Sequence, residues 1–258
     1  MSHSVTDSTV LLGHGSGGQM MKRIIDEVFL DAFGSPELLE GNDAGVAALP
    51  ASGRIAMSTD SFVVTPQFFP GGNIGKLAVC GTANDVAVSG ALPHYLSCGF
   101  ILEEGLEMAT LEAVVNSMAQ TAREAGIAIV TGDTKVVPRG AADKLFINTA
   151  GIGVIPTGIR WGAQQISAGD VLLVSGTLGD HGATILNLRE QMGLDGALSS
   201  DCAVLTPLIP PVAGTSSADM QISNEKQHSA RALVGHLNVL HPNRVQVFGQ
   251  AEVEAQRL

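Results

Sequence analysis

One stretch decides the fold class of this 258-residue chain: Ile127-Ala-Ile-Val-Thr-Gly-Asp-Thr-Lys135. Its first four residues, up to Val130, form an apolar run that is typical of a buried strand. The segment before it has helical spacing and predicts a helix with an N-cap at Thr110 and an end at Gly126. Because strands and helices alternate in this way along the chain, the sequence predicts a mixed α/β fold, which can equally be described as α+β.

Apolar spacing elsewhere outlines the other elements. Helices are expected from the Gly-rich N-terminal stretch to Gly34, at Ile74 to Val88 and at His181 to Met192. Strands are expected at Val46 to Leu49, Ile55 to Ser58, Leu96 to Leu102, Leu145 to Val154 and Asp170 to Val174, with a hairpin-type connection between the first two.

Breaks in these patterns predict three parts of the chain. Residues 1–160 are expected to form an N-terminal domain, and residues 161–209 the start of a C-terminal domain. The apolar residues of 210–258 lack a helical or strand period, so we expect this segment to be a poorly ordered tail.

Composition narrows the function classes. The formal net charge of -11 argues against nucleic acid or an anionic membrane as a partner, because both would repel the protein. No uncharged apolar run approaches ~18 residues, so no transmembrane segment is expected. The three cysteines show no metal-binding spacing and predict a reducing, cytoplasmic location.

Four aspartates are each set among small residues, which leave room for Mg2+ and a bulky anion to approach the backbone. They are Asp43, Asp60, Asp85 and Asp133. Taken singly, Asp43 and Asp60 are equally well interpreted as turn or cap residues. Their joint occurrence predicts a metal-nucleotide site.

Two of these aspartates have neighbours that strengthen this interpretation. In an extended strand Asp133 and Lys135 project to the same face, so a metal ligand and a phosphate-binding cation would lie together. A surface ion pair is the alternative. Asp85 follows Asn84 within an apolar helix, where a carboxylate needs a partner or a metal; an exposed polar stripe is the alternative.

The Gly-rich segment His14-Gly15-Ser16-Gly17-Gly18 directly precedes a predicted helix and is a plausible anion clamp. It matches neither the Walker nor the Rossmann glycine pattern. A mobile N-terminal segment with His14 exposed to solvent is the alternative. His181 follows Asp180, a natural helix N-cap, and is interpreted as a first-turn residue.

With these motifs assembled, the chain resembles the HypE family of hydrogenase-maturation proteins, within the aminoimidazole ribonucleotide synthetase-like superfamily. The resemblance covers roughly residues 10 to 209. It rests on His14-Gly-Ser-Gly-Gly18, Ser58-Thr-Asp-Ser-Phe62, Phe68-Phe-Pro-Gly-Gly-Asn-Ile-Gly-Lys-Leu77, Gly81-Thr-Ala-Asn-Asp-Val86, Gly132-Asp-Thr-Lys-Val136 and Gly176-Thr-Leu-Gly-Asp-His-Gly182.

The resemblance implies an N-terminal domain that dimerises through its sheet and binds ATP with Mg2+ near the subunit interface. It assigns the four aspartates to the metal and phosphate side, and Asp85 and Lys135 to catalysis. The nucleotide contacts that it implies are His14, Gly15, Ser16, Gly17, Gly18, Asn84, Thr131, Gly132 and Lys135.

The implied reaction starts from a carbamoyl group that the partner HypF delivers to the sulfur of a C-terminal cysteine. ATP-dependent dehydration turns this S-carboxamide into a thiocyanate, the source of the cyanide ligands of nickel-iron hydrogenase. The complex of HypC and HypD is the other implied partner.

The sequence departs from the family after about residue 209. The family ends in Pro-Arg-Ile-Cys, whereas this chain has no cysteine after Cys202 and ends at Leu258. We therefore expect the C-terminal part to be truncated or replaced. The alternative function is a non-catalytic ATP-binding or partner-binding remnant, and a third is a phosphotransferase similar to thiamine-monophosphate kinase or selenophosphate synthetase.

Overall fold

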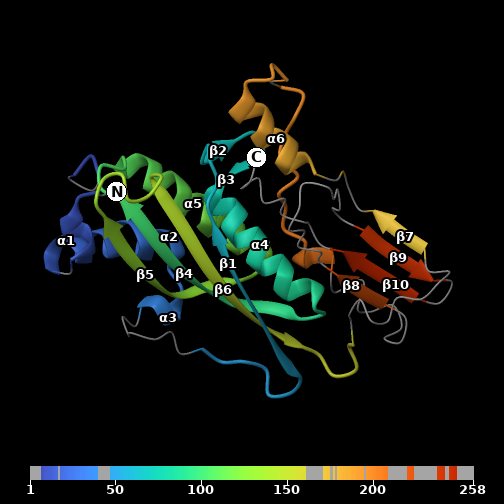
Figure 1. The fold of residues 1–258 in the computed structure, drawn as a ribbon. Helices are drawn as coiled ribbons and strands as arrows, with labels where there is room; N and C mark the ends of the chain where they lie inside the picture. Colours follow the sequence, from blue (N-terminus) through green and yellow to red (C-terminus); the bar gives the residue numbers. More distant parts are fainter. Residues whose placement is uncertain are drawn as a thin grey trace.

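A four-stranded mixed sheet forms the centre of the structure, a computed structural model (Figure 1). The model describes residues 7–16, 18–39, 47–160, 171–174, 177, 179–194 and 196–208, and strands at 220–223, 237–241 and 244–248. The central strands are β1 (Arg54–Phe62), β4 (Leu92–Glu103), β5 (Ala128–Val137) and β6 (Leu145–Ile155), in the order β1-β6-β4-β5. β6 runs antiparallel to β1 and β4, and β5 runs parallel to β4, which confirms the predicted mixed α/β fold.

Helices α4 (Ile74–Val88) and α5 (Met108–Ala125) pack on one face of this sheet (Figure 1). Glycines on β6 allow α4 to approach closely: a Cβ on Gly151 would come within 2.9 Å of Thr82, and one on Gly153 within 2.6 Å of Val86. Along most of β4 and β6, every second side chain points towards the helices and is buried. The opposite face carries exposed apolar side chains, and Ile55 and Met57 are each 68% exposed.

The N-terminal part packs beside β5. A 3-10 turn, η1 (Leu12–Gly15), leads into α1 (Gly18–Ile24), a π-helical segment η2 (Ile25–Leu30) and α2 (Asp31–Phe33). The helix ends at Gly34, as predicted, because this glycine adopts the left-handed conformation with φ of 54°. A short α3 (Pro36–Leu39) follows.

Four local predictions are wrong. Asp180 is the first residue of the helix before Gln191, and the N-cap is Gly179 in a left-handed conformation. Residues 47–49 of the expected Val46 to Leu49 strand are irregular, because the β1–β6 ladder begins only at Arg54 and offers them no partner. Thr110 lies inside α5, whose N-cap is Glu107. β5 does not stop at Val130 but continues to Val137, because its pairing with β4 extends that far.

Beyond the central sheet, β7 (Val171–Val174) pairs with β9 (Leu237–His241), which pairs with β10 (Arg244–Phe248). β8 (Met220–Ser223) completes this second sheet in the order β7-β9-β10-β8. Segment 210–258 thus contains strands, and the order of its other residues lies outside the described part of the chain. Among the described residues, no helix is long and apolar enough to cross a membrane.

Helix α6 (Asp180–Glu190) packs on the small hairpin of β2 (Phe68–Phe69) and β3 (Gly72–Asn73) through His181. The His181 ring makes an edge-on contact with Phe69, and its Nδ1 lies 3.0 Å from Ser200 Oγ. Burial, with a contribution from the Arg189 cation, lowers the pKa of His181 from 6.5 to about 4. The folded protein therefore holds this ring neutral.

Stability should depend on pH through His181. Because its folded pKa is depressed, the unfolded chain takes up the proton first as pH falls from 6.5 towards 4. Across that window the wild type should lose up to about 3 kcal/mol of unfolding free energy relative to a His181→Gln variant. Urea unfolding at a series of pH values measures this difference, and parallel pH profiles for the two proteins would contradict it.

Candidate functional site

Asp85 on α4 contacts β1 at Ser58, two residues along the strand from Asp60. Ser58 Oγ on β1 donates a hydrogen bond of 2.9 Å to Asp85 Oδ2 on α4. Alternation along a strand places Asp60 on the same face as Ser58, so both aspartates are on the helix-covered side of β1. Both are partly buried. Two carboxylates beside a hydroxyl are oxygen donors of the kind that Mg2+ prefers.

The segment Thr131 to Lys135 lies on β5, at the opposite edge of the sheet. Asp133 and Lys135 are both exposed and pair with alternate residues of β4, so they share one face as predicted. Gly132 is required by close packing, because a Cβ there would collide with the carbonyl oxygen of Cys98.

A cavity of about 520 Å³ opens beside this segment, between β5 and the N-terminal helix. Its apolar wall includes Met21, Phe29 and Phe100, and its polar wall includes Thr131 and Asp133. An apolar pocket with a few polar groups in its wall is typical of a site for a small organic ligand.

The sheet separates these two groups of residues. Asp60 pairs with Thr149, Thr149 with Cys98, and Cys98 with Gly132, so three strand spacings, about 14 Å, lie between the backbones at Asp60 and Gly132. Two oxygen ligands of one Mg2+ lie no more than about 4 Å apart. A single chain therefore does not bring Asp60 and Asp133 to one metal ion. In the described part of the chain, no cluster of three or more His, Cys, Asp or Glu side chains has metal-binding geometry.

The Gly-rich loop lies on the β5 side. Gly15 packs directly on this strand, because a Cβ there would come within 2.6 Å of the Val136 nitrogen. Ser16 is exposed, and its hydroxyl donates to the Gly13 carbonyl at 3.1 Å. Gly18 has φ of 76° and lines the cavity. Gly17 lies outside the described residues.

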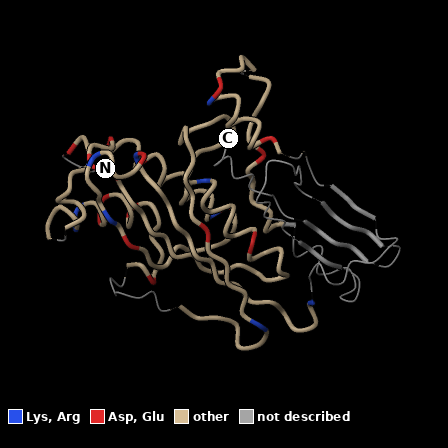
Figure 2. Tube along the Cα trace, viewed as in Figure 1, with Lys and Arg blue, Asp and Glu red and all other residues tan. Residues whose placement is uncertain are grey.

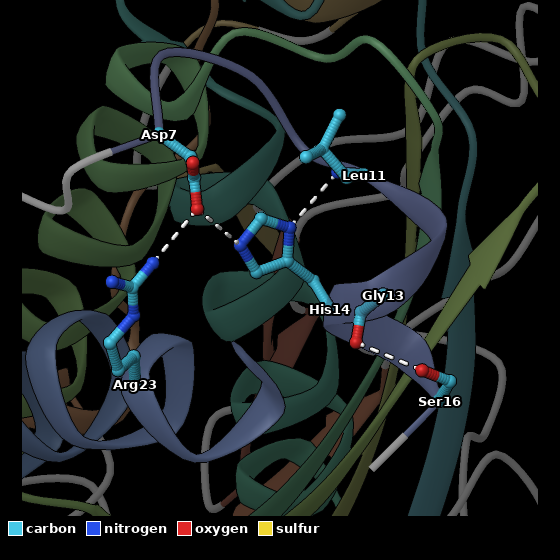
Figure 3. Close-up of polar contacts among 6 residues, drawn as sticks. All are labelled: Asp7, Leu11, Gly13, His14, Ser16 and Arg23. Carbon is cyan, nitrogen blue, oxygen red and sulfur yellow. Dashed lines mark hydrogen bonds and ion pairs between the residues drawn. The ribbon is translucent and has the colours of Figure 1, made fainter. Parts of the chain in front are cut away.

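His14 is not exposed, so the alternative interpretation in which its side chain faces solvent is wrong. Its side chain is completely buried, Nδ1 accepts a hydrogen bond of 2.9 Å from the Leu11 nitrogen, and Nε2 lies 3.5 Å from Asp7 Oδ2 (Figure 3). Both ring nitrogens therefore face groups of the protein.

The buried side chain of Asn84 connects α4 to the segment that follows α6. Its Nδ2 donates to the Ala203 carbonyl and its Oδ1 accepts from the Leu205 nitrogen, both at 2.9 Å. A nucleotide contact by this amide would have to replace one of these bonds.

Asp43 lies outside the described residues. Sequence reasoning did not single out Ser58, although it lies in the motif that contains Asp60, and it missed Asp7 and Arg23, which stand in no motif.

A family model for the AIR synthase related protein, N-terminal domain, matches residues 41–155. The chain is 72% identical over 206 residues to the carbamoyl dehydratase HypE of Escherichia coli (strain K12), covering 78% of this chain and 61% of that protein. It is 37% identical over 230 residues to a hydrogenase expression/formation protein of Methanocaldococcus jannaschii, covering 87% of this chain and 67% of that protein. The chain belongs to the HypE family.

Solved HypE structures agree with this assignment. A crystal structure of HypE in complex with ATP is 53% identical and superposes with a TM-score of 0.76, over 79% of this chain and 60% of that one. HypE in a HypE–HypF complex is 47% identical with a TM-score of 0.61, over 74% and 61% of the two chains. The chain thus spans between 59% and 62% of the length of the first HypE-family relatives that it matches.

Replacing Asn84 should cost stability. Asn84→Ala leaves the Ala203 carbonyl and the Leu205 N–H without their partner, and we expect a loss of about 2 to 3 kcal/mol in the free energy of unfolding. Asn84→Asp keeps the acceptor for Leu205 but sets a carboxylate oxygen against the Ala203 carbonyl, so it should lose at least as much. Urea unfolding measures both, with Asn116→Ala on the exposed face of α5 as the control. A loss of equal size in the control would contradict the role of the buried amide.

Proposed function

We propose that this chain supplies the ATP-binding part of a HypE-type carbamoyl dehydratase. The observation that carries the proposal is the division of its site residues into two half-sites on opposite edges of one sheet. The first half-site consists of Asp60 and Asp85 with Ser58, and the second of the loop His14 to Gly18, the cavity and Thr131 to Lys135. Membership of the HypE family and the ATP complex of a relative that is 53% identical support the nucleotide.

Each half-site fits one part of Mg·ATP. Asp60 and Asp85 offer the carboxylate oxygens that would hold Mg2+. The cavity beside Phe29 and Phe100 would take the adenine ring, and Lys135 would contact the phosphates. When bound, Mg2+ supplies positive charge close to the phosphoryl group that is transferred. Lys135 would add a second, fixed positive charge close to the same phosphoryl group.

In the proposed reaction the amide oxygen of a protein-bound S-carboxamide attacks the γ-phosphorus of ATP, and ADP leaves. The oxygen then departs as phosphate while the nitrogen loses both protons, which leaves an S-bound cyano group. Activation is needed because the amide oxygen is a poor leaving group until it is phosphorylated. The chain's own residues bind and orient the ATP for this step.

A second copy of the chain would join the two half-sites. One face of the central sheet is packed by helices, whereas the other carries exposed apolar side chains such as Ile55 and Met57. Exposed apolar surface of this kind marks an interaction site. A homodimer formed through this face would bring the β1 edge of one copy near the β5 edge of the other, so that each ATP contacts both copies.

Complementation between variants tests the shared site. Asp85→Asn and Lys135→Ala should each weaken Mg·ATP binding by about tenfold or more, because each removes a charge-assisted contact. When the two variants are mixed and allowed to exchange subunits, one site in each mixed dimer is intact. Calorimetry should then recover wild-type affinity in about a quarter of the sites.

The control mixture combines Asp85→Asn with Asp60→Asn, two variants of the same half-site. No exchange of subunits can restore an intact site in that mixture. If the mixture of Asp85→Asn and Lys135→Ala also binds Mg·ATP weakly while both variants are dimeric, the proposal of a shared site is wrong. Equal ATP affinity with and without Mg2+ would contradict the proposed role of Mg2+ in the site.

The state of the three cysteine thiols indicates that this chain binds ATP or a partner but does not carry the carbamoyl group on a sulfur of its own. Cys80, Cys98 and Cys202 are all buried. Burial raises the pKa of the Cys98 thiol, and a hydrogen bond with Cys80 together with burial raises the pKa of Cys202. Buried thiols with raised pKa values are poor nucleophiles. This chain would then act as an ATP-binding or partner-binding module.

We therefore expect no thiocyanate to form on this chain. After incubation with ATP, Mg2+ and the carbamoylating partner, the intact mass should stay unchanged, because no exposed thiolate is available to accept the group. A mass gain that matches cyanylation, mapped to any of the three cysteines, would show that one of them reaches the site.

We propose HypF as the carbamoylating partner, supported by the HypE–HypF complex that includes a relative of this chain. The HypC–HypD complex is proposed as the acceptor of the cyanide ligand from the family resemblance. The net charge of -11 supports neither a nucleic acid nor an anionic membrane as a partner.

A further inference from the structure

An ion-pair network lies beneath the Gly-rich loop and connects it to the N-terminal segment. Asp7 Oδ2 lies 2.8 Å from Arg23 Nη2 on α1 and 3.5 Å from His14 Nε2 in η1 (Figure 3). Figure 2 shows how sparsely charged residues are distributed over the described chain. A carboxylate that contacts two basic side chains from different elements therefore stands out.

The orientation of the His14 ring follows from its contacts. Nδ1 accepts the Leu11 N–H, and Nε2 faces Asp7. The ring is fully buried, so these contacts hold its orientation. Because the ring is fully buried, His14 is not placed to contact a phosphate directly.

Asp7 itself is held by backbone pairing. The chain that follows it runs beside the segment before α5: the Met108 nitrogen donates to the Ser8 carbonyl at 2.9 Å, and the Gly105 nitrogen donates to the Val10 carbonyl at 2.7 Å. An isolated bridge joins Thr9 and Glu107. The backbone that follows Asp7 is thus fixed relative to the central sheet.

The network contacts both sides of the loop. His14 lies at its start, and Arg23 lies on the helix that follows it. Between them, Gly15 has no room for a side chain against β5, and Gly18 has a positive φ. Glycines lower the cost of close packing but leave the backbone free to adopt other conformations. The loop therefore depends on outside contacts to keep one shape.

We propose that Asp7 and Arg23, acting through His14, are positioning residues that hold the described parts of the Gly-rich loop, Gly13 to Ser16 and Gly18, in the conformation that receives the ATP phosphates. This inference rests on the proposed nucleotide function. It gives His14 a structural task inside the site in place of direct contact with the nucleotide, and it adds two residues that no motif contains. Preorganised backbone donors bind an anion more tightly because no ordering cost remains.

The test compares Asp7→Asn and Arg23→Ala with Arg23→Lys in the full chain. Hydrogen exchange of residues 13–18 should become at least fivefold faster in Asp7→Asn and Arg23→Ala, and Mg·ATP affinity should fall about five- to thirtyfold. Arg23→Lys keeps the cation and should recover most of the affinity. The thermal midpoint of each variant shows whether it folds normally. The matched control is Glu124→Gln, an exposed carboxylate in an i,i+4 contact with Gln120 on α5, and it should change neither quantity.

Unchanged exchange of the loop and unchanged Mg·ATP affinity in a folded Arg23→Ala variant would overturn the proposal. Equal changes in loop exchange and in Mg·ATP affinity for Arg23→Lys and Arg23→Ala would also overturn it, because keeping the positive charge at position 23 would then make no difference. If Asp7→Asn does not fold, the Arg23 pair decides the result. Failure of the wild type to bind Mg·ATP would refute the nucleotide function, while loop exchange in the variants would still test the network itself.

Discussion

The register of β6 with its two neighbours controls the geometry of the whole candidate site. β6 pairs with β1 on one side and with β4 on the other, and this order leaves β1 and β5 as the two edges of the sheet. The ladder sets a fixed spacing between strands, so residues on β1 and β5 cannot approach each other within one chain. This spacing determines which of the aspartates can act together in one chain.

The same sheet also decides how its two faces are used. Gly151 and Gly153 on β6 let α4 pack closely, and this packing places Asp85 next to Ser58. The uncovered face keeps exposed apolar side chains such as Ile55 and Met57, and the proposed second copy would pack on it. Close helix packing and an open sheet face are two consequences of one arrangement, and together they favour a site shared between two copies.

The N-terminal network shows how a flexible sequence can be given one conformation. A glycine-rich loop has a high conformational entropy, and its own residues offer few side chains to restrict it. Asp7, His14 and Arg23 provide that restriction from outside the loop. Charged groups that are partly buried interact more strongly than exposed ones, because less water screens them.

The sequence by itself determined the helix at Ile74 to Val88, the end of the first helix at Gly34 and the mixed α/β class, because these features depend on local spacing and on glycine conformation. It also placed Asp133 and Lys135 on one face through strand alternation. It could not show that β5 extends to Val137, that His14 is buried or that Asn84 bonds to Ala203 and Leu205. Those features arise from partners far along the chain. Only the tertiary structure separated Asp60 from Asp133, because the order of strands in a sheet is decided by long-range pairing that no local pattern records.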